Sequence, residues 1–181
     1  IDFAEEVLGR SANCGDVVVH RSATSYDPVH GVSMVDGRIL WRRDLHAELN
    51  DRCPGQLSED ALMITRGSLP DVFVVTRDRQ VAGCSLDDGA IRWTAPDVTV
   101  PYSWPLIEDG RIPIWNGQRF TVIDEATGTI LVDRQHPDLA GVFHEKRGSI
   151  LGDLVVFVSE SGHVVAFDLQ TGDLRFNKLH K

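Results

Sequence analysis

The sequence lacks the features that mark several large classes of protein. None of its apolar runs approaches the roughly 18 residues that a membrane-spanning helix needs. Lysine and arginine form no cluster denser than the pair Arg42-Arg43, and 18 basic residues against 27 acidic ones give a net charge of −9. Because contacts with phosphate groups require grouped basic side chains, we expect neither a nucleic-acid partner nor a membrane span.

Cysteine is scarce. Cys14, Cys53 and Cys84 are separated by 39 and 31 residues, and no C-x-x-C pair occurs. This spacing argues against a zinc ribbon and against a thioredoxin-type site. The three residues are either small buried side chains or one disulfide with one free thiol, and only the disulfide would imply an oxidising compartment. The sequence leaves their pairing open.

Short motifs of catalysis and metal binding are also missing. The histidines form no H-x-H, H-x-x-x-H or H-E-x-x-H pair, and Gly-x-Ser-x-Gly does not occur. We therefore assign no catalytic, cofactor-binding or metal-ligating residue, and we expect most histidines to lie in exposed loops. The seven histidines are His20, His30, His46, His136, His144, His163 and His180.

What is present is the composition of a globular protein. The 181 residues are 42% apolar and 25% charged, which suits one compact domain. The chain starts at Ile1, from which we expect a processed chain or an excised piece.

One design recurs four times along the chain. An apolar run, a tight turn and a second apolar run lead to a turn that contains glycine, and a short strand with a large residue closes the unit. The glycines stand 52, 39 and 44 residues apart, close to the 40–45 residues of a four-stranded propeller blade. The four closing segments are residues 36–41, 88–93, 127–132 and 171–176.

The runs themselves predict β-strands. They are short, rich in β-branched and aromatic residues, and bounded by turn residues. Successive apolar positions indicate strands that are buried on both faces. These runs are residues 17–19, 72–75, 112–115 and 154–158.

The segments between the runs carry two further signals. Asn116-Gly117 predicts a type I′ hairpin. Helical signal is confined to residues 45–50 and 58–64, each long enough for a turn or two, and this region is expected to be an inserted loop on one rim.

The fourth closure carries a family resemblance. Residues 166–176 resemble the tryptophan-docking motif of the pyrroloquinoline-quinone-type (quinoprotein-like) propeller repeats, whose pattern is Ala, Asp, Thr, Gly and a final Trp. Ala166, Asp168, Thr171 and Gly172 match it, and Phe176 replaces the tryptophan.

The other three closures match the motif in part. The third unit keeps Asp124, Thr127 and Gly128. The second keeps Gly89 and Trp93, and the first keeps Gly37 and Trp41. The four copies lie in register from about residue 15 to residue 176.

The resemblance implies an all-β fold, a β-propeller of four-stranded antiparallel blades. About four blades would fit this chain, with approximate boundaries at 1–44, 45–96, 97–135 and 136–181, inside one domain of 1–181. It also implies that the large ring docks on the neighbouring blade. The residues expected to dock blade on blade are Gly37, Trp41, Gly89, Trp93, Asp124, Thr127, Gly128, Asp168, Thr171, Gly172 and Phe176.

Three functions compete at this stage. The preferred one is a non-enzymatic scaffold for a protein or peptide, similar to outer-membrane assembly or extracellular sensor propellers, with no cofactor and an extracytoplasmic location. The alternative is a fragment of a quinone-dependent dehydrogenase that binds pyrroloquinoline quinone and calcium. The family's dehydrogenases have adjacent cysteines, which this chain lacks. The third is a cytoplasmic interaction module, for which all three thiols would be free.

Two groups of loop residues are candidates for the central funnel. One group is Tyr26, Asp27 and His30, and the other is Asp138, His144 and Glu145. Because four blades close only with steep rotation between them, we expect part of a seven- or eight-bladed propeller. A closed four-bladed ring and a ring of two chains remain open, so the partners include the remaining blades or a second copy.

Overall fold

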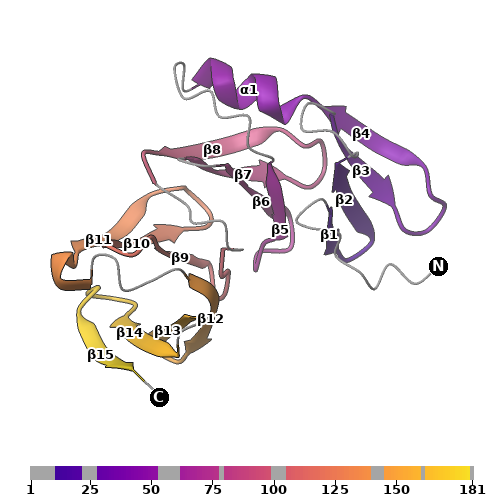
Figure 1. Cartoon of the computed structure of the whole chain (residues 1–181). Coiled ribbons are helices and arrows are strands. Elements are labelled where there is room, and N and C mark those ends of the chain that lie inside the picture. The colour runs from indigo at the N-terminus through magenta and orange to yellow at the C-terminus, as the bar shows by residue number, and fades with distance from the viewer. Residues whose placement is uncertain are drawn as a thin grey trace.

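The computed structural model describes residues 11–21, 28–52, 62–77, 80–98, 105–139, 145–159 and 162–179. Four antiparallel sheets follow one another along the chain, as predicted (Figure 1). Within the described residues, no helix is long and apolar enough to cross a membrane.

The strands of each sheet run in sequence order. The first sheet holds β1 (Ser11–Cys14), β2 (Val17–Arg21), β3 (Val29–Ser33) and β4 (Ile39–Arg43). The second holds β5 (Met63–Arg66), β6 (Val72–Arg77), β7 (Gln80–Ser85) and β8 (Ile91–Pro96). The third holds β9 (Arg111–Trp115), β10 (Arg119–Asp124) and β11 (Ile130–Gln135). The fourth holds β12 (Glu145–Leu151), β13 (Leu154–Ser159), β14 (His163–Asp168) and β15 (Leu174–Leu179).

The predicted apolar runs all form strands. They lie in β2, β6, β9 and β13. Every residue of β6 and β7 is buried, which is the pattern of strands covered on both faces. The third sheet has three strands among the described residues, and residues 99–104 lie outside them.

Apolar clusters join each sheet to the next. Val19 and Trp41 of the first sheet pack with Phe73 of the second. Trp93 packs with Ile112 and Ile123 between the second and third sheets. Trp115, Phe120 and Phe167 do the same between the third and fourth. The sheets therefore pack in a row, and the first and last sheets lie at its opposite ends (Figure 1).

The last strand pair of every sheet contains a register shift at the same place. The shifts fall at residues 31/32, 83/84, 122/123 and 166/167. Such a bulge turns the strand and re-aims the side chain that follows. It therefore sets the direction of the large residue that closes each unit.

One of the two helical segments forms as predicted. Helix α1 (Leu45–Arg52) begins after Asp44, whose Oδ1 accepts a hydrogen bond of 3.0 Å from the backbone N–H of Ala47, as an N-cap does. Its buried side chains are Leu45 and Leu49. A short 3-10 helix, η1, spans Pro137–Leu139.

The second helical prediction is wrong where the structure tests it. Met63 and Ile64 open strand β5, and Ile64 pairs with Val75 of β6. Pairing with a buried central strand overrides the weak local helical preference. Residues 58–61 lie outside the described part.

The Asn116-Gly117 hairpin is confirmed, but its predicted turn type is wrong. Three residues separate β9 from β10, and Asn116 does not have the positive φ that a type I′ turn requires. Its side-chain oxygen instead accepts hydrogen bonds from the backbone N–H groups of Gln118 (3.1 Å) and Arg119 (2.8 Å). The asparagine side chain thus closes this turn in place of a second left-handed residue.

Candidate functional site

The four repeat glycines occupy the same place in four turns. Gly37, Gly89, Gly128 and Gly172 have φ between +72° and +74°, the left-handed region that glycine adopts without strain. Each donates its backbone N–H to the carbonyl four residues earlier, at 2.8–2.9 Å.

Aspartate and threonine close two of these turns. Asp168 Oδ1 accepts the backbone N–H groups of Gln170 and Thr171 at 2.9 Å, and its Oδ2 lies 2.8 Å from the Arg175 guanidinium. The Arg175 contact and these amide donors lower the pKa of Asp168 to about 2. Asp124 likewise accepts the N–H and hydroxyl of Thr127, at 2.8 and 2.7 Å. These residues complete the turns.

Trp41 connects the first sheet to the second. Its indole N–H donates a 2.7 Å hydrogen bond to the carbonyl of Leu86, and its ring stacks on Phe73 with centroids 5.7 Å apart. A Cβ placed on Gly31 would lie 2.2 Å from the ring, and one on Gly89 would lie 2.6 Å from it. The ring is held between a glycine of its own sheet and the turn glycine of the next.

Trp93 repeats this contact one sheet further on. Its indole N–H donates 2.8 Å to the carbonyl of Glu125. The ring lies against Gly83 of its own sheet and Gly128 of the third sheet, where a Cβ would approach within 2.2 and 2.5 Å. Each indole ring thus lies between a glycine of its own sheet and the turn glycine of the next sheet.

The third contact reaches the same place with different side chains. Val132 lies against Gly172, where a Cβ would come within 2.5 Å of it. Arg134 Nε donates 3.1 Å to the carbonyl of Thr171, and His136 Nε2 lies 3.0 Å from the carbonyl of Gly172. Sequence analysis missed Arg134 and His136 because they lie outside the eleven-residue motif.

Among the described residues, no neighbouring sheet covers the remaining two predicted docking residues. Phe176 is half-buried, and the Lys178 Nζ lies 5.3 Å from its ring centroid. A Cβ on Gly37 would meet nothing within 4 Å. Packing of Phe176 between blades therefore stays a prediction, because the described residues hold no sheet beyond the fourth.

Glu125 is an additional contact residue that the motif did not reveal. It is fully buried, with 0% of its surface exposed. Its carboxylate accepts the Ser68 hydroxyl and, at 3.1 Å, the backbone N–H of Leu69, both from the second sheet's first turn. A Cβ on Gly67 would lie 2.3 Å from this carboxylate. The only local signal was a charged residue where the other units have Met34, Leu86 and Leu169.

The cysteines and histidines form no site around these contacts. Cys14 and Cys84 are free thiols, and burial raises the pKa of both, that of Cys14 to about 11. Cys53 lies outside the described residues. Across the described ranges, no three His, Cys, Asp or Glu side chains gather as they would around a metal ion.

The expectation of loop histidines is wrong for several of them. His20, His30 and His163 lie in strands, and His46 lies in helix α1. His20 stands directly opposite His30 in the β2–β3 register. Local spacing cannot reveal a pair that meets across two strands.

The two funnel candidates are only partly described. Tyr26, Asp27 and His144 lie outside the described residues. His30 is half-buried in β3, Asp138 is exposed in η1, and Glu145 opens β12. Both funnel groups therefore stay predictions.

One rim of the molecule gathers paired turns. In the first, second and fourth sheets, the turn before the second strand lies beside the repeat-glycine turn. In the third sheet, the turn before β9 takes this place. One backbone hydrogen bond of 2.8–3.0 Å joins the two turns of each sheet. We call this surface the paired-turn rim. Its joining pairs are Met34–Asp16, Leu86–Asp71, Glu125–Gly110 and Leu169–Asp153, each N–H donor first.

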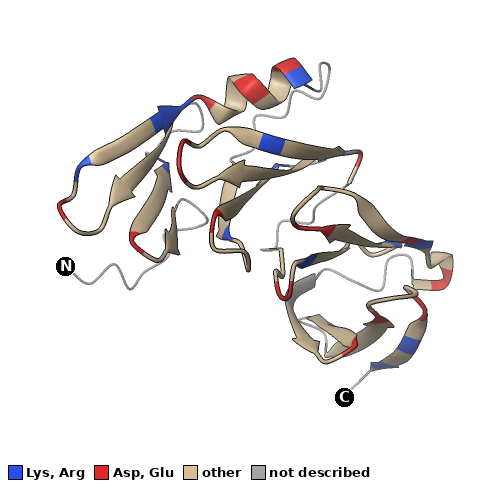
Figure 2. Cartoon of the chain, turned by 180° about the vertical axis from the view of Figure 1, so that it is seen from behind, with Lys and Arg blue, Asp and Glu red and all other residues tan. Residues whose placement is uncertain are grey.

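The paired-turn rim is acidic. Figure 2 shows Asp and Glu at the hairpin ends of the sheets. Three of its carboxylates have an arginine within 4.0 Å: Asp36 with Arg38, Asp71 with Arg92, and Asp173 with Arg134. The exposed acidic residues of the rim are Asp16, Asp36, Asp71, Asp87, Asp88, Glu108, Asp109, Asp153 and Asp173.

Comparison with known proteins agrees with this architecture. The family model described as "Outer membrane protein assembly factor BamB" matches residues 27–178. No curated protein sequence matches the chain.

Solved structures share the fold at low sequence identity. BamB from Moraxella catarrhalis is 19% identical with a TM-score of 0.64, over 93% of this chain and 47% of that one. The quinohemoprotein alcohol dehydrogenase ADHIIG from Pseudomonas putida HK5 is 13% identical with a TM-score of 0.64, over 94% and 34%. The computationally designed Ika4 protein is 12% identical with a TM-score of 0.63, over 93% and 95%. The chain thus spans about half the length of BamB.

Proposed function

Because this chain belongs to the BamB family of pyrroloquinoline-quinone-type β-propeller repeats, we propose that it is a non-enzymatic scaffold that binds a protein or peptide outside the cytoplasm. The family is described by a role in outer membrane protein assembly, which favours a protein partner and a periplasmic location. One domain of four blades, divided as the repeat predicts, would present the binding surface.

The observation that carries this proposal is the paired-turn rim. Its turns connect strands of the sheets, and backbone hydrogen bonds join the two turns of each sheet, so they offer a preformed surface. Exposed carboxylates such as Asp16, Asp87 and Asp153 give that surface negative charge. Complementary charge on a partner would speed association and select a basic or neutral segment.

The repeated polar residues also favour a scaffold over an enzyme. Asp124, Thr127, Asp168 and Thr171 are hydrogen-bonded within their own turns. Trp41 and Trp93 are used in contacts between sheets. Turn formation and packing thus account for the motif without any chemical step.

Site-directed cross-linking tests the proposed surface. A photoreactive amino acid at Asp87 samples the paired-turn rim, and one at Gln118 samples an exposed turn of the opposite rim as a matched control. We expect a discrete protein adduct from position 87 in the native cell envelope and none from position 118. Equal labelling from both positions, or no adduct from position 87, would contradict the proposal.

Charge removal tests the same surface quantitatively. Asp87→Asn with Asp153→Asn removes two rim charges, and Asp138→Asn removes one charge on the opposite rim. Once the cross-linked partner is identified, each rim charge removed should weaken its binding about 1.5- to 5-fold, the range of an exposed ion pair. Added salt should weaken the wild-type complex more than the rim variant. An equal effect of Asp138→Asn would count against the rim.

The alternative, a quinone-dependent dehydrogenase fragment, is favoured only by the shared fold with quinohemoprotein dehydrogenases. The described residues do not fit that cofactor set, because they gather no metal-ligand group and Cys14 and Cys84 are separate free thiols. Titration with pyrroloquinoline quinone and calcium, followed by quinone absorbance, should show no stoichiometric binding. A saturable one-to-one signal would favour the dehydrogenase.

A further inference from the structure

The repeat-glycine turns have the same layout in all four sheets. Each turn has four positions, and the repeat glycine is the fourth. The backbone N–H of the first position donates to the other turn of the paired-turn rim. A side-chain oxygen at the third position accepts the backbone N–H two residues later, at 3.0–3.3 Å. Three of the four positions therefore build the turn itself. The third-position residues are Asp36, Asp88, Thr127 and Thr171.

The second position is the exposed tip of each turn. Its residue is exposed in all four sheets, and the first one, Val35, is 84% exposed. The side chains at this position differ in kind: one is branched and apolar, one is acidic, one is small and one is an amide. The layout of the turn thus leaves the chemistry of its tip open. We call these residues the tip residues, and they are Val35, Asp87, Ala126 and Gln170.

The first sheet holds the residues on both sides of Asp87. Trp41 donates its indole N–H to the backbone carbonyl of Leu86 at 2.7 Å. Arg43 Nε donates to the backbone carbonyl of Asp88 at 3.1 Å. Because both neighbours of Asp87 are bonded to the preceding sheet, little further ordering of its backbone is needed when a partner binds.

The tips of the third and fourth sheets are held in a similar way. Trp93 donates at 2.8 Å to the carbonyl of Glu125, the residue before the third tip. Arg134 donates at 3.1 Å to the carbonyl of Thr171, the residue after the fourth tip. Three successive tips therefore stand on turns that are anchored to the preceding sheet, and specific recognition depends on such fixed positions.

Asp87 is the tip residue that carries a charge. Within the described residues, the rim carboxylates that an arginine approaches within 4.0 Å are Asp36, Asp71 and Asp173, and Asp87 is not among them. An exposed carboxylate accepts charge-assisted hydrogen bonds from lysine and arginine side chains. The second tip therefore suits a basic residue of a partner.

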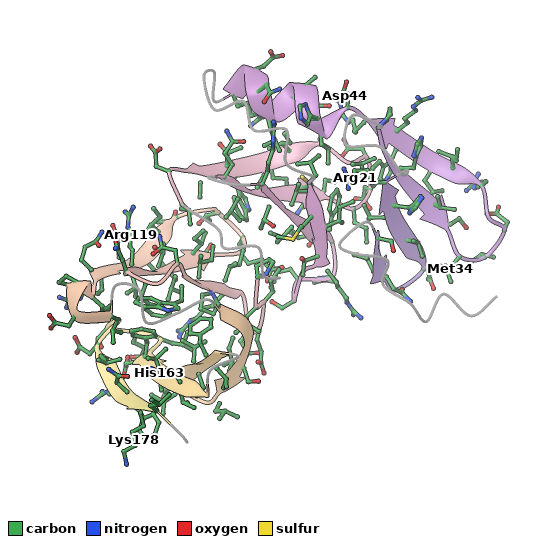
Figure 3. All side chains as sticks on the ribbon, viewed as in Figure 1. Arg21, Met34, Asp44, Arg119, His163 and Lys178 are labelled. Carbon is green, nitrogen blue, oxygen red and sulfur yellow. The ribbon has the colours of Figure 1, made fainter. Side chains whose placement is uncertain are left out.

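The tips follow one another along the row of sheets (Figure 1). Figure 3 shows Met34, the residue before the first tip, and Asp44, the residue before helix α1, at opposite ends of the first sheet. A partner that contacts several tips runs from sheet to sheet along the rim. Because packed sheets lie about 10 Å apart, roughly three or four residues of an extended segment reach from one tip to the next.

We propose that the tip residues determine the specificity of the paired-turn rim, and that the partner presents an extended segment whose lysine or arginine binds the carboxylate of Asp87. This inference rests on the proposed function, because it concerns the same rim. The apolar tip Val35 and the amide tip Gln170 would each favour a segment residue of matching polarity.

Selection from a phage-displayed library of random peptides tests the proposal. Peptides of about twelve residues are long enough to run past the four tips. On the immobilised wild-type chain, the selected peptides should share a lysine or arginine and, roughly three or four residues from it, a second restricted position. On the Asp87→Lys chain, an acidic residue should replace the basic one. Circular dichroism checks that the variant is folded.

A synthetic peptide from the wild-type selection then allows a charge exchange. Asp87→Lys should weaken its binding about 2- to 30-fold, because repulsion replaces the attraction of an exposed ion pair. A peptide with glutamate in place of its basic residue should bind the Asp87→Lys chain more tightly than the original peptide does, since groups in contact are coupled.

Asp153→Lys is the matched control for the charge exchange. Asp153 is an exposed carboxylate of the same rim but not a tip residue. The glutamate peptide should therefore bind the Asp153→Lys chain no better than the original peptide does.

Three results would overturn the proposal. They are a library that yields no binding peptide, selected peptides that are the same for the wild-type and Asp87→Lys chains, and a glutamate peptide that the Asp153→Lys chain favours equally. The cross-link from position 87 is a separate measurement, because it reports contact with the rim and not recognition of a side chain. A cross-link without restricted peptide positions would retain the rim as a binding surface and reject the tip residues as its specificity determinants.

Discussion

The indole nitrogen of Trp93 and the backbone carbonyl of Glu125 lie 2.8 Å apart, so one hydrogen bond ties the outer strand of the second sheet to the turn of the third. The side chain of that same glutamate returns to Ser68 and Leu69 of the second sheet. Glu125 therefore accepts hydrogen bonds from the second sheet with both its backbone carbonyl and its side-chain carboxylate. Substitutions at this junction should therefore weaken the contact between the second and third sheets.

Truncation of Trp93 should destabilise the protein strongly. Trp93→Ala removes a buried ring from between two glycines and is expected to lower the free energy of unfolding by about 3–5 kcal/mol. Chemical denaturation followed by circular dichroism measures the change. Leu131→Ala, at a half-exposed position, serves as the control and should cost less than about 1 kcal/mol. An unchanged midpoint for Trp93→Ala would disprove its role as a contact between sheets.

Removal of the Glu125 side chain should also be costly. Glu125→Ala removes the buried carboxylate that accepts hydrogen bonds from the Ser68 hydroxyl and the Leu69 N–H, and the loss of hydrogen bonds to a charged group should cost about 1.5–3 kcal/mol. Glu125→Gln keeps a carbonyl oxygen of similar size and should recover part of this loss. The two variants are compared by urea unfolding. If Glu125→Gln is as damaging as Glu125→Ala, the hydrogen-bond explanation is wrong.

Asp168 should make stability depend on acid pH. Its pKa in the folded chain is about 2, below the ordinary value of 3.8, so its carboxylate stabilises the folded state above about pH 4. That stabilisation is lost as the pH falls from about 4 toward 2. Wild-type protein should therefore be more stable than Asp168→Asn at pH 7, and the difference should shrink through this window. A difference that stays constant from pH 7 to pH 2 would contradict the assignment.

Cys84 should resist alkylation in the folded protein. The thiol is 0% exposed, and burial raises its pKa, so little reactive thiolate forms near neutral pH. Iodoacetamide labelling at pH 8, mapped by peptide mass spectrometry, should modify Cys84 only slowly until urea is added. Fast labelling without denaturant would mean that the second sheet opens readily.

Local patterns determined much of the secondary structure. The strand runs, the four glycine turns and the helix at residues 45–50 all follow from side-chain type, turn chemistry and short periods. Those signals act over a few residues, so one sequence is enough to show them. The errors in turn type and in the second helix have the same origin. The Asn116 side chain bonds across its turn, and Ile64 pairs with another strand, and neither partner is visible in the local pattern.

The sequence by itself determined that four similar units follow one another and which residue closes each. Only the tertiary structure decided what each closing residue meets, because contacts such as Trp41 with Leu86 and Glu125 with Ser68 join positions 45 and 57 residues apart. Packing of one sheet on the next buries Glu125, and strand pairing within the first sheet places His20 opposite His30. Among the described residues, no sheet packs on Gly37 or Phe176, although their own segments resemble those at the three junctions, because a contact between sheets needs surfaces from both.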